Sequence, residues 1–332
     1  NVGMKILIRE GSAARNFDAL HSLISLHPDK VMFCSDDKHP DDLVAGHINV
    51  LVKKAVAFGH SVFDVLRCAS LNPIEHYDLP IGRLRVGDRM DAVLVNNLQD
   101  FKPLATWLAG EKVAEHGVSL LPHYAVEAIN RFNAKPIFES DLEIPATGSN
   151  IRVIKALDGE LLTLATEHEA KIVNNKIVPS PENDVLLLAV VNRYQTAKPA
   201  LAFIEGFGLK HGALASSVAH DSHNVIAVGS SAALVAKAIN TVINAKGGIA
   251  VASSKGVELL ELPIAGLMST EEGDTVAVSY AVLDAMAKDL GSTLRAPFMT
   301  LSFMALLVIP ELKLSDKGLF DSKQFKFIDV VF

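Results

Sequence analysis

The stretch that decides the fold reads Val31-Met32-Phe33-Cys34-Ser35-Asp36-Asp37-Lys38-His39-Pro40. Its first three residues are apolar and have the length of a short buried strand, and an amphipathic segment follows the stretch. Two acids therefore stand where a strand ends and a helix approaches, which is the edge at which parallel α/β folds carry their chemistry. The same letters also fit a turn with a helix cap, and the spacing alone leaves both interpretations open.

Around this stretch, the first 80 residues predict the order strand, helix, strand, helix, helix. Residues 4–8 form a short apolar run that indicates the first strand. One helix is expected to start at Asp41 or Asp42 and to continue to Gly59, because apolar residues recur on one face. Ser61, with an acid three positions later, resembles a capping box for the next helix. This order fits strand-helix units of a (β/α)₈ barrel.

The rest of the chain falls into two segments that differ in predicted secondary structure. Over residues 81–145, short strands joined by Gly, Asp and Asn turns are expected. Beyond them the pattern predicts an α+β domain, with one helix capped by Ser230 or Ser231 and another over residues 276–290. Arg193 lies in a loop of this domain and is expected to face solvent. The strands expected there span residues 151–157, 161–165, 185–191, 201–207, 225–228, 249–252 and 257–262.

The composition is that of a globular protein, because 49% of the 332 residues are hydrophobic. The net charge of −7 comes from 38 acidic and 31 basic residues without long runs, which disfavours a nucleic-acid surface. Two cysteines favour a reducing, cytoplasmic setting. No run of 18 apolar residues indicates a membrane span. Because the first residue is Asn1, we expect the chain to begin inside a longer protein.

Five segments of the sequence resemble the adenine deaminase family of the amidohydrolase superfamily. They occur in the family's order from near the first residue to near the last, with Ser35 where the family has Thr. The segments are Arg9-Glu10-Gly11-Ser12-Ala13-Ala14-Arg15-Asn16, Phe33-Cys34-Ser35-Asp36-Asp37-Lys38-His39-Pro40, His220-Asp221-Ser222-His223-Asn224, Leu262-Pro263-Ile264-Ala265-Gly266-Leu267-Met268-Ser269 and Pro297-Phe298-Met299-Thr300-Leu301-Ser302-Phe303.

The resemblance implies a fold, a division of the chain and an activity. Residues 1–80 would be the last strand-helix units of a (β/α)₈ metal-dependent hydrolase barrel, and residues 81–145 would be part of a small β-sandwich. Residues 146–332 would be the family's C-terminal α+β domain. The implied reaction is the hydrolytic deamination of adenine to hypoxanthine and ammonia in purine salvage. The front of the barrel has no counterpart in this sequence, so the chain alone is expected to be inactive.

The resemblance also implies a catalytic residue. Asp36 matches the family's Asp at the end of the last barrel strand, which binds the metal or its water and moves the proton. A divalent metal generates hydroxide near neutral pH, and a nearby carboxylate can shuttle the proton to the departing nitrogen. Asp37 is the alternative register, and Asp36 is favoured because a residue at the strand tip points into the barrel mouth.

The implied cofactor is a divalent metal, with manganese or iron favoured and zinc possible. Asp36 is the one metal ligand expected in this chain, because the sequence holds 12 histidines but no His-x-His pair. A single carboxylate does not hold a catalytic metal.

Four further residues are candidate substrate-binding residues. Ser12 and Arg15 follow a predicted strand and are placed to hydrogen-bond the purine edge, although Arg15 also fits a solvated helix start. His220 and His223 are expected to reach back toward the barrel mouth to bind substrate, order a lid or hold a second metal. Their alternative is a hydrogen-bonded turn. The expected partners are adenine, the preceding barrel segment and further copies of the chain, with no nucleic acid and no membrane.

Other functions were weighed against this one. A zinc nucleobase deaminase is excluded, because the sequence has neither its His-x-Glu nor its Pro-Cys-x-x-Cys signature. A degenerate or non-catalytic relative with a structural or regulatory role stays open. An amidohydrolase that acts on another cyclic amide or amidine also stays open.

Overall fold

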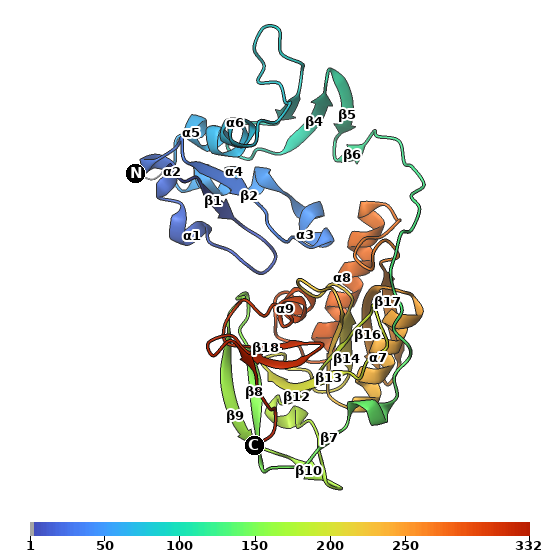
Figure 1. The fold of residues 1–332 in the computed structure, drawn as a ribbon. Helices are drawn as coiled ribbons and strands as arrows, with labels where there is room; N and C mark the ends of the chain where they lie inside the picture. The colour runs from blue at the N-terminus through green and yellow to red at the C-terminus, as the bar shows by residue number, and fades with distance from the viewer. Residues whose placement is uncertain (1–2) are drawn as a thin grey trace. The chain divides into compact units, whose positions relative to one another are not determined.

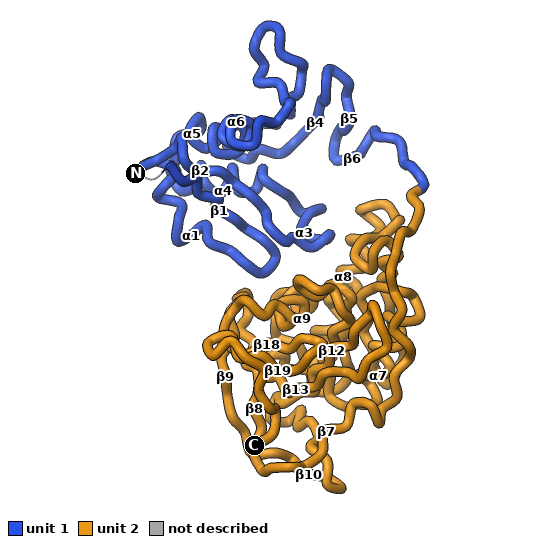
Figure 2. Tube along the Cα trace, viewed as in Figure 1, with its two compact units in different colours: residues 1–125 blue, residues 126–332 orange. Residues whose placement is uncertain are grey.

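The computed structural model describes residues 3–332, which have a mixed α/β architecture with several separate sheets. The chain divides into two compact units, residues 1–125 and 126–332 (Figure 2). Each unit has its own hydrophobic core. The mixed α/β character predicted from the sequence is confirmed. Within the described residues, no helix combines the length and the apolar character needed to cross a membrane.

The first unit begins with two parallel strands, β1 (Ile6–Arg9) and β2 (Val31–Cys34) (Figure 1). Ile8 and Val31 are fully buried, and the apolar run therefore forms a core strand as predicted. The register pairs Arg9 with Cys34, so both strands end at the same edge. The helices of this unit are α1 (Phe17–Leu20), α2 (Leu23–Leu26), α3 (Pro40–Ala45), α4 (Ile48–Ala57), α5 (Val62–Leu66) and α6 (Asn72–Tyr77), with a π-helical turn at Arg67–Leu71.

The prediction of one helix from Asp41 or Asp42 to Gly59 is wrong. Two helices form instead, and Gly46 separates them with a φ of +154°, which no α-helix accommodates. The first of them already begins at Pro40, whose fixed φ suits the first helical position. The capping box at Ser61 is wrong as well, since its side chain makes no capping hydrogen bond.

The first unit also holds a four-stranded antiparallel sheet, in the order β3-β4-β5-β6. Two-residue turns that contain glycine join β4 to β5 and β5 to β6, and a longer connection with Asn and Asp joins β3 to β4, in line with the sequence pattern. The strands are β3 (Ala92–Val95), β4 (Pro103–Leu108), β5 (Glu111–Glu115) and β6 (Val118–Ser119).

The second unit is built around one eight-stranded sheet in the order β17-β16-β14-β15-β12-β13-β8-β9. All neighbouring strands are antiparallel except β13 and β8, which are parallel. The strands are β8 (Asn150–Ala156), β9 (Thr163–Glu169), β12 (Leu186–Val191), β13 (Ala200–Glu205), β14 (Ala213–Ser216), β15 (Val225–Gly229), β16 (Gly248–Ser253) and β17 (Gly256–Glu261).

Smaller elements complete this unit. Its helices are α7 (Ala232–Asn244), α8 (Gly273–Asp289) and α9 (Pro297–Phe303), with 3₁₀ turns at Glu139–Leu142 and Pro181–Asn183. Its short strands form two three-stranded sheets, β7 (Ile144–Pro145) with β10 (Ile172–Val173) and β11 (Lys176–Ile177), and β18 (Leu312–Ser315) with β19 (Gly318–Asp321) and β20 (Lys326–Phe327).

Helix α7 lies against one face of the eight-stranded sheet, on a floor of small side chains (Figure 1). Ala213, Ala215, Ala227, Ala250 and Ala252 belong to this core. A Cβ at Gly229 would lie 2.8 Å from a methyl of Val235 on the helix, so the helix approaches the sheet closely. The opposite face carries the alternate, larger residues of the same strands, such as Leu214, Ile226 and Val228. Helix α9 contacts β14 and β15.

Most elements predicted for this unit are confirmed, and one central strand was missed. The Ser231 side chain accepts a hydrogen bond from the Leu234 amide and caps α7 as expected. Strand β14, with the sequence Ala-Leu-Ala-Ser, was not predicted, because alanine is a weak strand former. It forms because its neighbours β15 and β16 bury it on both sides.

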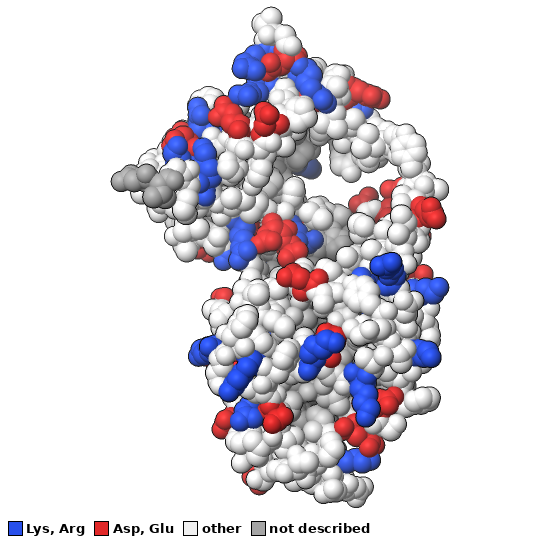
Figure 3. Space-filling model, viewed as in Figure 1, with Lys and Arg blue, Asp and Glu red and all other residues white. Residues whose placement is uncertain are grey.

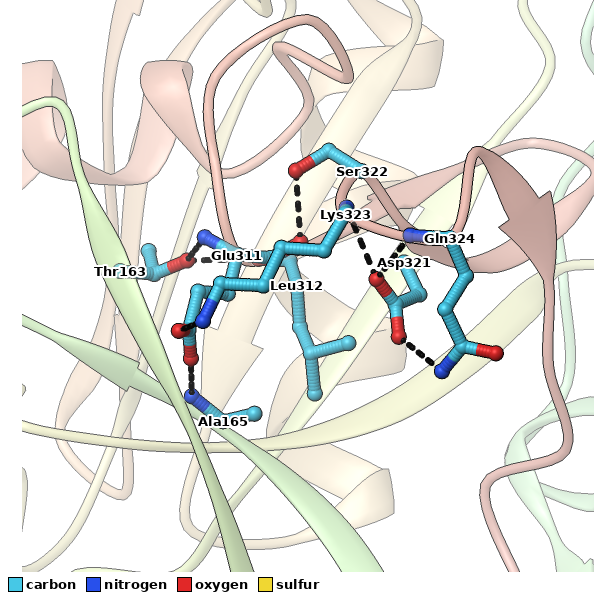
Figure 4. Close-up of polar contacts among 8 residues, drawn as sticks. All are labelled: Thr163, Ala165, Glu311, Leu312, Asp321, Ser322, Lys323 and Gln324. Atoms are coloured by element: carbon cyan, nitrogen blue, oxygen red, sulfur yellow. Dashed lines mark hydrogen bonds and ion pairs between the residues drawn. The ribbon is translucent and has the colours of Figure 1, made fainter.

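The Glu311 carboxylate links the β18–β19 hairpin to the edge strand β9 (Figure 4). One oxygen of Glu311 accepts a hydrogen bond from the Ala165 amide (2.7 Å), and the other pairs with Lys323. The Thr163 hydroxyl donates to the Leu312 carbonyl at 2.9 Å. The hairpin is thereby held to the edge of the large sheet. On the face drawn in Figure 3, acidic and basic side chains are interspersed in both units.

Next to this contact, Lys313 on β18 is fully buried. Its Nζ donates a hydrogen bond to the Leu161 carbonyl at 2.7 Å. Burial lowers the pKa of Lys313 to about 7, since a charged ammonium loses its hydration there.

We predict that this lysine makes stability rise with pH above neutrality. Between about pH 7 and its ordinary pKa, the unfolded chain binds a proton that the folded chain does not, so the free energy of unfolding increases with pH. Lys313→Met should remove this increase and stabilise the chain at pH 7. Urea unfolding at pH 7 and at about pH 9 measures the free energy of unfolding of each protein. Lys317→Met, on the same hairpin, is the exposed control. An equal pH dependence in all three proteins would contradict the prediction.

Candidate functional site

The carboxyl ends of β1 and β2 bring two loops together, residues 10–16 and 35–39. The Ser12 amide donates a hydrogen bond to the Asp37 carbonyl (2.9 Å), and the Glu10 amide donates to the Cys34 carbonyl (3.3 Å). A Cβ at Gly11 would lie only 2.7 Å from the Asp37 carbonyl oxygen, so glycine is required for this approach. The parallel register therefore places both predicted site loops at one edge.

Asp36 lies two residues beyond the end of β2 and pairs with Arg9 from β1. Its Oδ2 is 2.5 Å from Arg9 Nη1, and both side chains are 35% exposed. Its Oδ1 accepts a hydrogen bond from the Asp37 amide at 3.0 Å. The φ of Asp36 is +56°, an uncommon value for a residue other than glycine. Arg9 was missed by sequence reasoning, because only the strand register reveals that it faces the loop after β2.

Ser12 joins the two loops and the start of α3. Its side chain is buried, and its hydroxyl donates to Asp42 Oδ2 (2.6 Å) while it accepts a hydrogen bond from the His39 amide (2.8 Å). Burial lowers the pKa of His39 to about 4, so its imidazole is neutral at physiological pH. The Ser12 hydroxyl uses its one proton in the hydrogen bond to Asp42.

Arg15 lines a cavity of about 230 Å³ beside these loops. Its Nε donates to the Gly11 carbonyl at 2.9 Å, which fixes the direction of the guanidinium. Lys38 and Lys54 line the same cavity; Lys38 donates to the Gly46 carbonyl (2.6 Å). Asp36 is not among the residues that line it. The cavity wall therefore combines cationic side chains with the carboxylates of Glu10 and Asp42, and both kinds of group are suited to contacting a polar ring.

His220 and His223 lie in the second unit, in the connection between β14 and β15. The His220 amide donates to the Ser302 carbonyl (3.1 Å), and its ring stacks on Phe303 with centroids 4.8 Å apart. The two imidazoles are 5.6 Å apart, centroid to centroid. His223 has a φ of +51°, and its amide donates to the Ala219 carbonyl at 2.6 Å. The turn is therefore rigidly attached to α9.

Arg193 is buried, and the prediction that it faces solvent is wrong. Its Nη1 donates to the Ala265 carbonyl (2.6 Å), and its Nη2 donates to the Tyr194 hydroxyl (3.0 Å). Tyr194 in turn donates to the Ser222 carbonyl at 2.8 Å. These contacts engage both terminal nitrogens of the buried guanidinium, whereas its Nε has no hydrogen-bond partner. They tie the loop after β12 to the segments 262–269 and 220–224. Sequence reasoning missed this role, although both segments had been singled out.

The described residues do not by themselves fit a catalytic metal. Across residues 3–332, no three His, Cys, Asp or Glu side chains lie close enough together to hold one. Asp36 offers one carboxylate, and its nearest cation is the guanidinium of Arg9. One ligand does not form a metal site.

Comparison with known proteins defines first the class and then the family. Residues 5–113 match the amidohydrolase family, which assigns the first unit to that class of hydrolases. Residues 160–326, half of the chain, match the adenine deaminase C-terminal domain. The chain belongs to the adenine deaminase family.

Individual relatives agree with this assignment. The chain is 54% identical to an adenine deaminase of Sulfurovum sp. and 51% identical to one of Salinibacter ruber, over 98% of this chain in both cases. It is 44% identical to an adenine deaminase of Borreliella burgdorferi over 99% of this chain. The matched part is 60% of the length of the first two relatives and 61% of the third.

We predict that the hydrogen bonds of the Ser12 hydroxyl stabilise the first unit. Ser12→Ala leaves the His39 amide and the Asp42 carboxylate without this partner and should lower the free energy of unfolding of the first unit by about 1–3 kcal/mol. Ser61→Ala is the matched control, because Ser61 precedes α5 but makes no capping bond, and it should change stability by less than about 0.5 kcal/mol. Urea unfolding measures both, and equal losses would contradict the role assigned to Ser12.

Proposed function

We propose that the complete protein deaminates adenine hydrolytically to hypoxanthine and ammonia in purine salvage. The observation that carries the proposal is Asp36, a carboxylate beyond the end of a buried parallel strand in a chain of the adenine deaminase family. The proposed partners are adenine, a further barrel segment and other copies of the chain in the cytoplasm, without nucleic acid or membrane. In this proposal β1 and β2 are the last strands of a (β/α)₈ barrel, residues 81–145 are part of a β-sandwich, and the C-terminal domain follows.

Asp36 acts in this proposal as the proton shuttle. It accepts a proton from the attacking water and delivers it to the C6 amine, which leaves as ammonia while oxygen takes its place on the ring. A carboxylate has about four lone-pair positions. The bonds from Arg9 and from the Asp37 amide occupy one position on each oxygen, and they leave others for the reacting groups.

The same proposal assigns roles to the other predicted residues. Arg15 donates from its guanidinium to acceptor nitrogens of the purine. Ser12 contacts the purine edge beside it and also holds the loop that carries Arg15 through its bonds to Asp42 and the His39 amide. His220 and His223 bind substrate, order a lid or hold a second metal. Asp36 is one ligand of a divalent metal, manganese or iron before zinc, whose other ligands lie outside the described residues.

The first test is adenine deamination by the chain alone and by the chain joined to a family barrel segment, followed as ammonia release with added manganese. We expect activity only in the extended protein. There, Asp36→Asn should lower kcat roughly 10²- to 10⁴-fold, because the shuttle is lost. Asp37→Asn is the matched control and should retain most activity. Loss of activity in Asp37→Asn alone would move the role to Asp37, and no activity in either protein would favour a degenerate relative.

A second test concerns the turn in the second unit. His223→Ala in the extended protein should raise KM or lower kcat, because the imidazole is proposed to act on the substrate. His211→Ala, in another loop of the same unit, is the control. Unchanged steady-state kinetics in His223→Ala would remove His223 from the site.

A further inference from the structure

A pair of histidines in the first unit lies apart from the proposed catalytic residues. His21 follows α1, and His60 lies between α4 and α5. His21 Nδ1 is 3.0 Å from His60 Nε2, and both side chains are partly exposed. The pair therefore joins two helical segments that are distant in sequence and can be reached by a solute ion.

Both rings are held in place before any ligand arrives. The His21 ring stacks on the fully buried Phe17, with centroids 5.7 Å apart and an interplanar angle of 13°. The edge contact with Phe58, at 4.7 Å between centroids, fixes it from another side. His60 Nδ1 is 2.7 Å from the Ser25 hydroxyl oxygen. Each imidazole thus has one nitrogen within hydrogen-bond distance of the other, and neighbouring side chains support both rings.

The contact between the two nitrogens holds at most one proton. Two protonated rings would place two N–H groups against each other at 3.0 Å. Burial lowers the pKa of His60, and the neighbouring His21 lowers it further, so His60 stays neutral at physiological pH. When its Nδ1–H donates to Ser25, its Nε2 lone pair faces His21. This is the arrangement of a metal-binding histidine with an orienting oxygen behind it.

We propose that His21 and His60 form a binding site for a first-row transition cation, Cu²⁺ or Ni²⁺, with water in the remaining positions. The cation displaces the proton shared by the two nitrogens and lies off the line between them, so each ring turns its nitrogen lone pair toward the ion. With metal–nitrogen distances of about 2.0–2.1 Å, nitrogens 3.0 Å apart subtend roughly 90–100° at the metal. That angle suits neighbouring positions of a square-planar or octahedral ion, which are geometries of Cu²⁺ and Ni²⁺.

The charges near this pair allow a cation to bind. Lys54 is the nearby ammonium, over the face of Phe17 at 4.4 Å from the ring centroid. It is paired with Asp18 (3.0 Å) and Glu10 (3.4 Å), so its charge is balanced locally. A cation bound by His21 and His60 would crosslink α1 to the turn between α4 and α5 and stabilise the first unit.

Titration of the untagged full chain with Cu²⁺ or Ni²⁺ tests the site. Calorimetry should show one saturable equivalent, and the ion should raise the Tm of the first unit until EDTA removes it. Binding should weaken in acid, since a proton held between the two nitrogens competes with the cation for them. The Cu²⁺ electron paramagnetic resonance spectrum should show hyperfine splitting from two imidazole nitrogens.

Substitutions test whether the cation binds at His21 and His60. His60→Ala and His60→Gln should each weaken binding about tenfold or more, and Ser25→Ala should weaken it up to roughly tenfold. His76→Ala, an exposed histidine at the end of α6, is the control and should bind as the unchanged chain does. Circular dichroism establishes that each variant is folded. Binding that survives both His60 substitutions, or the absence of a saturable equivalent in the unchanged chain, overturns the proposal. Binding lost in Asp36→Asn but kept in His60→Ala also overturns it.

Discussion

The first unit depends on the parallel pairing of β1 with β2. This register sets Arg9 opposite Cys34, so the loops that follow the two strands start side by side. The close approach at Gly11 and the hydrogen bond from Ser12 to the Asp37 carbonyl then lock these loops together. The ion pair between Arg9 and Asp36 is a consequence of this geometry, because a one-residue slip of β1 would turn Arg9 to the other face of the sheet.

The second unit is organised differently, around one large and mostly antiparallel sheet. Its polar connections are attached to each other through buried groups. Arg193 links its own loop to the Ala265 carbonyl and to Tyr194, and Tyr194 reaches the turn that contains Ser222. Two of the five segments that resemble the family, residues 220–224 and 262–269, are therefore joined through hydrogen bonds, although they are far apart in sequence.

The sequence predicts features that local chemistry determines. The apolar run before Asp36 forms the buried strand, and Ser231 caps α7, because burial and capping need only neighbouring residues. Features that depend on distant partners were not predictable. Gly46 breaks a continuous apolar pattern, and β14 is a strand only because β15 and β16 flank it. Arg193 is buried against the Ala265 carbonyl, 72 residues away, which accepts one of its hydrogen bonds. The pairing of Asp36 with Arg9 likewise appears only once the register is known.

The alanine floor beneath α7 has a consequence for how this domain can vary among relatives. On that face the distance between helix and sheet is set by backbone and methyl groups, and Gly229 leaves no space for an added atom. The face can therefore accept almost no increase in side-chain volume, whereas the opposite face, with its Leu, Ile and Val residues, can exchange one branched side chain for another. Sequence variation should therefore be asymmetric across β14, β15 and β16, restricted on the face beneath α7 and less restricted on the opposite face.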